Sequence, residues 1–245
     1  MADLRHKHHL LLPEVGGQGQ KALEAAKVLV IGAGGLGCPI LSYLAAAGVG
    51  TLTVCDGDKI ELSNLQRQVL YTENDVGRPK AKIAAERLRA LNHEISVKPV
   101  TEYFSDANAK SLVSDCDLVV EGIDRIAGRH VINRACFEAG VPMLSAAASR
   151  FDGQVALFRP GAEGHPCYAC LVPREAEEDG ICDREGVLGP VVGLVGSLAA
   201  SEAIKLLCGI KPTLEKTLLV AHLKAGTVRR IGLERDPGCP VCGNK

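Results

Sequence analysis

The first half of the chain alternates between short uncharged runs and segments with helical spacing. Val28 to Cys55 contains no charged residue, but glycines interrupt it, so it is interpreted as several short buried elements. The predicted elements are a short helix at Ala22–Ala26, a strand at Lys27–Ile31, a small-residue helix ending near Gly48 and a strand at Thr51–Cys55. A strand, a helix and a strand in this order predict one parallel βαβ unit.

The same alternation continues to Ser149. Apolar residues with helical spacing predict helices at Lys80–Asn92, Ala107–Val113 and Ala127–Ala139. Apolar runs between these helices predict strands at Ser96–Val100, Asp117–Val120 and Met143–Ala146. Alternating elements of this kind are typical of the α/β class, here a Rossmann-like, doubly wound and mostly parallel sheet.

After Ser149 the pattern changes, and we expect a mixed or antiparallel continuation of the sheet. The predicted elements are a strand at Gln154–Arg159, a helix at about Val192–Leu207 and two strands at Thr217–Val220 and Thr227–Leu233. The uncharged stretch Gly186–Ser201 is shorter than a membrane span and contains Pro190, which favours a packed helix. The chain is expected to form one domain, with an N-terminal arm or helix at 1–26, a front half at 27–150 and a back half at 151–245.

Charge and composition narrow the expected partners and the expected compartment of the protein. The chain has 28 basic and 29 acidic residues, so its bulk charge gives no reason to expect nucleic acid or an anionic membrane as partner. We expect no signal peptide, because Met1 to Leu12 is polar and rich in histidine. The ten cysteines are not spaced like a secreted disulfide framework, so a reducing cytoplasm is the expected compartment.

The sequence Gly32-Ala-Gly34-Gly-Leu-Gly37 follows the first predicted strand and opens the next helix. Backbone amides and a helix N-terminus at such a turn can bind phosphates. Asp56 ends the second strand, 19 residues after Gly37, where a carboxylate can bond ribose hydroxyls. Taken alone, these residues favour a dinucleotide, NAD first and FAD second, and a tight turn that binds nothing stays an alternative.

Two long cations follow that a dinucleotide site does not need. Arg67 lies in Ser63-Asn64-Leu65-Gln66-Arg67-Gln68, and Lys80 opens the next predicted helix after Gly77-Arg78-Pro79. A triphosphate cleaved at its α-phosphate builds charge on the leaving pyrophosphate, which such cations can stabilise. The alternative is that both are solvated surface charges, the usual environment of Arg and Lys.

Asp124 follows the strand predicted at Asp117–Val120, at the edge where ligands bind in doubly wound sheets. A carboxylate there can hold Mg²⁺ that bridges phosphates. The alternative is an N-cap for the helix that begins near Ala127, and both roles can hold for one residue.

Two Cys-x-x-Cys pairs, Cys167/Cys170 and Cys239/Cys242, lie far apart in the back half. Four thiolates in two such pairs suit tetrahedral zinc, and because all four positions are filled we expect a structural role. Four unliganded thiols are the alternative. A redox pair is disfavoured, because neither motif lies in a thioredoxin-type βαβ context.

Several of these motifs occur together in an order typical of one family. They are Gly32–Gly37, Asp56-x-Asp58, Ser63–Gln68, Gly77-x-Pro79-Lys80, Asp124-x-x-x-x-Arg129-x-x-x-Asn133 and the two cysteine pairs. The chain resembles the bacterial ubiquitin-activating-enzyme-like adenylyltransferases of molybdopterin and thiamine biosynthesis, from about Arg5 to Gly243. The stretch Leu62–Gln68 is highly specific for this family, whereas the glycine turn is not.

The resemblance implies ATP-dependent adenylation of the C-terminal Gly-Gly carboxylate of a small ubiquitin-like sulfur-carrier protein, giving an acyl-adenylate and pyrophosphate. That carboxylate is already ionised at neutral pH, so the reaction needs no general base. By position, the resemblance implies a nucleotide site made of Gly32, Gly34, Gly35, Gly37, Asp56, Asp58, Asn64, Arg67, Gln68, Lys80 and Asp124. The resemblance further implies that Asp56 holds the ribose and that Asn64, Arg67 and Lys80 contact phosphates. It also implies that Asp124 coordinates Mg²⁺.

The resemblance also implies a homodimer and a carrier-binding back half with a crossover loop at 171–186. The family's usual N-terminal arginine, supplied to the phosphates from the partner subunit, is His8 here by spacing, and its usual Asp-Asn pair is Asp124-Arg125. Cys182, on the expected crossover loop, either forms a covalent link to the activated carrier, as in the thiamine branch, or has no chemistry. No rhodanese-like domain follows Cys242, so a separate protein is expected to donate sulfur. An NAD-dependent oxidoreductase and a non-catalytic carrier-binding adaptor stay as alternatives.

Overall fold

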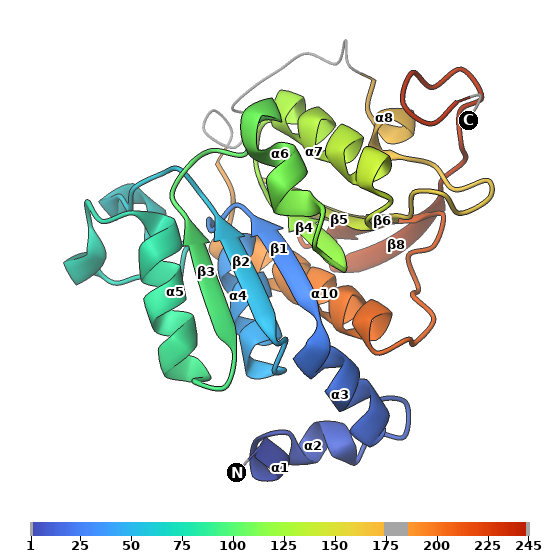
Figure 1. The fold of residues 1–245 in the computed structure, drawn as a ribbon. Helices are drawn as coiled ribbons and strands as arrows, with labels where there is room; N and C mark the ends of the chain where they lie inside the picture. The colour runs from blue at the N-terminus through green and yellow to red at the C-terminus, as the bar shows by residue number, and fades with distance from the viewer. Residues whose placement is uncertain (1, 174–185, 244–245) are drawn as a thin grey trace.

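The computed structural model describes residues 2–173 and 186–243. Within them, eight strands form one sheet in the order β3-β2-β1-β4-β5-β6-β7-β8 (Figure 1). The strands are β1 (Lys27–Ile31), β2 (Thr51–Cys55), β3 (Ser96–Val100), β4 (Leu118–Glu121), β5 (Met143–Ser149), β6 (Asp152–Phe158), β7 (Thr217–His222) and β8 (Thr227–Gly232). The five strands from β3 to β5 pair in parallel, and the remaining pairs are antiparallel. The predicted α/β class, with a parallel front and an antiparallel back, is confirmed.

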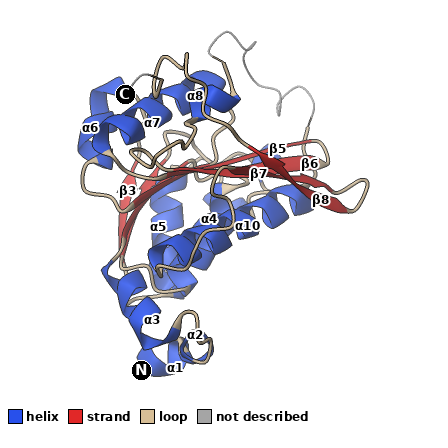
Figure 2. Cartoon of the chain, turned by 90° about the vertical axis from the view of Figure 1, so that its right-hand side faces the viewer, coloured by secondary structure: helices blue, strands red, loops and turns tan. Residues whose placement is uncertain are grey.

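Helices cover both faces of this sheet (Figure 2). One face carries α4 (Gly37–Ala46), α5 (Lys80–Leu91) and α10 (Gly189–Leu207), and the other carries α6 (Asp106–Val113), α7 (Ile126–Ala139) and α8 (Tyr168–Leu171). The central strand β1 is buried from both sides. Val28 and Val30 pack into the core of the α4 face, and Leu29 and Ile31 into the core of the α7 face. A strand buried on two faces is expected to be a continuous apolar run, as β1 is.

Helix α10 is the one helix among the described residues that is long and apolar enough to cross a membrane by length and composition. In this fold it lies in the core of the α4 face. Its fully or nearly fully buried residues include Val191, Val195, Ala199 and Ala203. A Cβ at Gly196 would lie 2.4 Å from Cγ of Pro39 on α4, so this glycine permits the close helix packing.

Two of the differences from the predicted boundaries have a clear physical reason. Helix α10 begins at Gly189 rather than near Val192, because Pro190 fits the first turn of a helix, where a missing amide hydrogen costs nothing. The N-terminal arm forms α1 (Ala2–Arg5), α2 (Lys7–Leu10) and α3 (Gly16–Ala25), where only a short helix at Ala22–Ala26 was predicted. Glycine disfavours helix, so the glycine-rich start of α3 hid it from a propensity argument.

Candidate nucleotide site and metal centre

The glycine turn leaves β1 and enters α4 at the carboxyl edge of the sheet. Gly32 has φ +93°, a left-handed conformation that favours glycine. Gly37 cannot carry a side chain, because a Cβ there would lie 2.0 Å from the carbonyl oxygen of Gly32. Gly35 lies against α10, with a Cβ position 3.2 Å from Cγ2 of Val192. The turn is therefore held by backbone contacts that only glycine allows.

Asp56 extends from the end of β2 to the glycine turn. Its Oδ2 accepts a hydrogen bond from the amide of Ala33 at 2.7 Å, and its Oδ1 accepts one from the amide of Asp58 at 2.8 Å. Burial raises the pKa of Asp56, and the nearby charge of Lys80 opposes that rise. The carboxylate thus lies beside the turn, where the sequence predicted a ribose contact.

Lys80 is a buried cation at this edge, with 6% of its surface exposed. Its Nζ donates to Oδ2 of Asp58 at 3.0 Å, and Oδ1 of Asp58 accepts from the hydroxyl of Tyr103 at 2.5 Å. Burial raises the pKa of Asp58, but the hydrogen bonds from Tyr103 and Lys80 outweigh it and hold that pKa below its usual value. The alternative that Lys80 is a solvated surface charge is therefore wrong.

The segment that follows β2 folds back over the turn through the 3₁₀ helix η1 (Leu62–Asn64). Asn64 is buried in a capping box with Glu61, and the half-exposed Arg67 donates to the carbonyl of Ser63 at 3.2 Å. Gln68 is 3% exposed and lies against Gly34, where a Cβ would be 3.6 Å from its Nε2. Its Oε1 is buried without a hydrogen-bond partner in the described part of the chain, which leaves an acceptor beside the glycine turn.

Asp124 is exposed, three residues beyond the end of β4. The N-cap position of α7 is Arg125, so the alternative that Asp124 caps this helix is wrong. Asp124 forms no hydrogen bond or ion pair with the described residues, and its oxygens are of the kind that Mg²⁺ prefers. The residue present therefore fits the predicted metal.

Three side chains at this edge were not singled out from the sequence. The hydroxyl of Tyr71 donates to the carbonyl of Ala33 at 2.7 Å and lies 3.4 Å from the carbonyl of Lys80, which joins the glycine turn to α5. Tyr103 holds Asp58, as described above. Glu121 is fully buried at the end of β4 and pairs with Arg129. The one signal for Glu121 was an acid closing an apolar strand.

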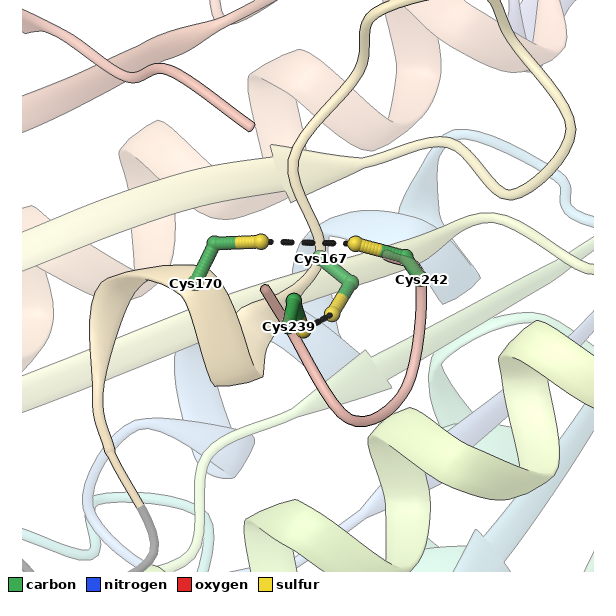
Figure 3. A group of neighbouring side chains, drawn as sticks. All are labelled: Cys167, Cys170, Cys239 and Cys242. Atoms are coloured by element: carbon green, nitrogen blue, oxygen red, sulfur yellow. Dashed lines mark hydrogen bonds between the residues drawn. The ribbon is translucent and has the colours of Figure 1, made fainter. Parts of the chain in front are cut away.

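The four cysteines of the two Cys-x-x-Cys pairs meet in space (Figure 3). Their four Sγ atoms lie within 4.8 Å of one another, with Cys167 to Cys239 at 3.6 Å and Cys170 to Cys242 at 3.3 Å. Tetrahedral zinc with Zn–S bonds of about 2.3 Å separates its sulfurs by about 3.8 Å. The donor set and its spacing fit zinc, as predicted, and all four ligands come from the protein.

Two further contacts hold this cluster in place. Asn133 on α7 makes both contacts. Its side-chain carbonyl accepts from the backbone amide of Tyr168 at 2.9 Å, and its side-chain Nδ2 lies 3.6 Å from Sγ of Cys167.

Burial raises the pKa of Cys167 to about 11. Burial also acts to raise the pKa of Cys239, but the backbone amides of Cys242 and Val241 outweigh it and lower this pKa to about 7. Zinc binds the deprotonated thiolates.

The described residues of this single chain do not test the expectations for His8 and Cys182. His8 is exposed on α2, far along the chain from the glycine turn. Cys182 and most of the expected crossover loop at 171–186 lie outside the described residues. No statement about the chemistry of Cys182 follows from the structure.

Known proteins match nearly the whole chain. A model described as the ThiF family matches residues 6–241. A sulfur carrier protein adenylyltransferase of Thermus thermophilus is 43% identical over 98% of this chain and 91% of that protein. A molybdopterin-synthase adenylyltransferase of Escherichia coli is 40% identical over 98% of this chain and 96% of that protein. The crystal structure of E. coli MccB with ATP superposes with a TM-score of 0.81 at 28% identity, covering 93% of this chain and 70% of that one.

Proposed function

The chain belongs to the ThiF family, and we propose that it uses ATP to adenylate the C-terminal Gly-Gly carboxylate of a small ubiquitin-like sulfur-carrier protein. The curated relatives that match almost end to end are adenylyltransferases, and two of them act on carriers of sulfur or on molybdopterin synthase by name. The observation that carries the proposal is the buried Lys80 at the carboxyl edge of the sheet, beside the glycine turn and Asp56.

A buried lysine needs an anion nearby, because removing an ammonium from water is costly unless it is paired. In this structure Asp58 supplies that anion at 3.0 Å. We propose that the phosphates of ATP share Lys80 with Asp58. Since the pair already lies at the edge of the sheet, the cation needs no large movement to meet an incoming phosphate. A preorganised cation of this kind stabilises charge that develops on a leaving pyrophosphate.

The other site residues divide the nucleotide between them. The amides of the glycine turn, Gly32 to Gly37, and the N-terminus of α4 bind phosphate oxygens. Asp56 bonds the ribose, while Asn64, Arg67 and Gln68 close the site from the segment that follows β2. Asp124 holds Mg²⁺, which when bound neutralises phosphate charge.

The chemical step requires little from the protein beyond position and charge. An oxygen of the carrier's carboxylate attacks the α-phosphorus of ATP, and the bond from that phosphorus to the bridging oxygen of pyrophosphate breaks. The carboxylate is ionised at neutral pH, so no side chain has to take up a proton. The products are the acyl-adenylate and pyrophosphate. Alignment of the two reactants and stabilisation of the leaving charge then supply the rate acceleration.

We assign a structural role to zinc and the carrier to the back half. The four cysteines fill every position of a tetrahedral site, so they leave no position for a reacting group. Residues 27–150 bind the nucleotide, and residues 151–245 receive the carrier. The working form is a homodimer.

Carrier-dependent exchange of label between pyrophosphate and ATP tests the proposal. A panel of Gly-Gly-ended carriers is assayed with the wild-type protein, with Asp124→Ala, and with Asp115→Ala as a matched control. Asp115 is an exposed acid paired with Lys27, away from the glycine turn. We expect exchange with one class of carrier, loss of exchange in Asp124→Ala, and wild-type exchange in Asp115→Ala.

Two outcomes would overturn the proposal. ATP binding without exchange across the panel would favour a carrier-binding adaptor. Tight NAD(H) binding without ATP binding would favour an oxidoreductase. A further variant, Cys182→Ser, is expected to keep full exchange, because an ionised carboxylate needs no thiol to attack ATP. Loss of exchange in folded Cys182→Ser would assign that thiol a part in the adenylation itself.

A further inference from the structure

A buried ion pair lies beneath the loop that carries Asp124. Glu121, the last residue of β4, has none of its surface exposed, and Arg129 on α7 is 7% exposed. Nε of Arg129 lies 3.4 Å from Oε2 of Glu121. The hydroxyl of Ser145 on the neighbouring strand donates to the other oxygen of Glu121. The pair therefore ties β4, β5 and α7 together at the carboxyl edge of the sheet.

Both members of this pair hold the backbone of Ile123. Oε2 of Glu121 accepts from the amide of Ile123 at 3.2 Å, and Nε of Arg129 donates to the carbonyl of the same residue at 3.2 Å. Nη2 of Arg129 donates to that carbonyl as well, and to the carbonyl of Ala146 at 3.1 Å. The amide and the carbonyl of one loop residue are thus fixed by two buried charges.

Ile123 sits between the glycine turn and Asp124. A Cβ at Gly32 would lie 3.2 Å from the carbonyl oxygen of Gly122 and 3.2 Å from Cγ2 of Ile123. A Cβ at Gly122 would lie 2.9 Å from Cβ of Leu36, within the turn that leads into α4. The loop at Gly122 and Ile123 therefore packs directly on the phosphate-binding turn. Asp124 is the residue that follows Ile123 in this loop.

Stability alone gives a weak reason for such a pair. The desolvation of two buried charges offsets much of their attraction, and apolar residues of similar volume often stabilise a fold as well. What apolar residues cannot supply is a donor and an acceptor for a particular backbone unit. Glu121 accepts from the amide of Ile123, and Arg129 donates to its carbonyl. Apolar side chains at these two positions would leave both backbone groups of Ile123 without these partners.

We propose that Glu121 and Arg129 are positioning residues for the nucleotide site, which hold Ile123 and thereby set the place of the Asp124 carboxylate relative to the glycine turn. This rests on the proposed function for the role of Asp124 toward Mg²⁺. Neither residue has to touch the nucleotide. Substitution of Glu121 or Arg129 should therefore raise the Mg²⁺ concentration that ATP binding requires. The contacts that the glycine turn itself makes with the phosphates should stay unchanged.

The test measures ATP binding by calorimetry over a series of Mg²⁺ concentrations, in the full-length protein. Arg129→Lys keeps the charge but cannot reach Ile123 and Ala146 together, and Glu121→Gln keeps the shape but removes the charge. Displacing a metal-binding carboxylate by about 1 Å is expected to raise the Mg²⁺ concentration for half-maximal ATP binding by about tenfold or more. Arg134→Lys is the matched control, because Arg134 lies on the same helix in a partly exposed pair with Asp106.

The outcomes separate a positioning role from a purely structural one. A structural role would lower the midpoint of thermal unfolding but leave the Mg²⁺ requirement of the folded protein at the wild-type value, and that result would overturn the proposal. If Arg129→Lys does not fold, Glu121→Gln carries the same expectation. Absence of carrier-dependent exchange in the wild type would instead count against the proposed function, because ATP binding is measured without a carrier.

Discussion

Asp75 offers a direct test of how the segment before Lys80 is held. Its carboxylate is 2% exposed and closes the 3₁₀ helix η2 (Glu73–Asp75). Oδ2 accepts from the amide and the hydroxyl of Thr72, both at 2.9 Å, and from Nη2 of Arg87 at 2.9 Å. Oδ1 accepts from Nη1 of Arg78 at 3.3 Å. One carboxylate thus joins the loop that leads to Lys80 with the helix that Lys80 begins.

The size of the effect follows from the pKa of Asp75. Burial alone would raise this pKa, but the hydrogen bonds from Arg87 and Thr72 outweigh it and lower the pKa from 3.8 to about 2. Such a difference corresponds to about 2.5 kcal/mol of stability at neutral pH, since each pH unit is worth about 1.4 kcal/mol. The two arginines are 46% and 48% exposed, so solvent screening reduces the expected loss in Asp75→Asn to about 1–2 kcal/mol.

The pH dependence has a definite sign. Because the folded-state pKa is depressed, the stabilisation is fully present above the unfolded value of 3.8 and is lost as the pH falls toward about 2. Urea unfolding is followed by circular dichroism and tyrosine fluorescence for the wild type and Asp75→Asn. The difference in unfolding free energy should stay constant between pH 7 and pH 5 and shrink as the pH falls below about 4.

Asp115→Asn is the control, since Asp115 forms an exposed pair with Lys27 and is expected to unfold like the wild type at neutral pH. A difference for Asp75→Asn that persists unchanged toward pH 3 would refute the electrostatic reasoning. A wild-type unfolding free energy for Asp75→Asn at pH 7 would do the same. In either case the packing of η2, rather than the charge of Asp75, would hold the segment.

Three further predictions concern the nucleotide and metal sites. Lys80→Met should fold but lower kcat/KM for carrier-dependent exchange by about 10²-fold or more, measured in steady state, because an apolar chain cannot stabilise the leaving charge. Gly37→Ala should abolish ATP binding in calorimetry, since its Cβ would lie 2.0 Å from the carbonyl oxygen of Gly32. Asn133→Ala should weaken zinc binding by about tenfold or more in competition with a chromogenic chelator, because Asn133 orients the Cys167 loop; unchanged zinc affinity would contradict that role.

Local pattern was enough to predict the central elements and the two chemical motifs. The bounds of β1, β2 and β3 agree with the sequence prediction. For β1 the reason is that a strand buried on both faces is a continuous apolar run, here ended by a charge and a glycine. The two cysteine pairs and the turn Gly32 to Gly37 were also visible, since their chemistry depends on short, fixed spacing. A mixed or antiparallel back half was predicted because the regular alternation of strands and helices ends at Ser149.

Residue roles that depend on long-range contacts could not be predicted in this way. Lys80 is a buried cation because Asp58, 22 residues earlier, pairs with it, and Tyr103 holds Asp58 from 45 residues away. Spacing in the sequence alone could not reject a solvated surface position for Lys80. The glycine-rich start of α3 was missed for the same reason: tertiary packing overrides a local propensity against helix.

The chain's own order of residues thus determined the strands, the phosphate-binding turn and the thiol donor set. The tertiary structure decided which distant groups face one another: the cysteine pairs meet across 72 residues, and Arg129 reaches back to Glu121 and Ile123 beneath the candidate nucleotide site. Local conformation depends on neighbouring residues, so the spacing of apolar and polar residues along the chain predicts it. Burial and the pairing of charges depend on which segments the folded sheet brings together, and a single sequence carries no periodic signal for them.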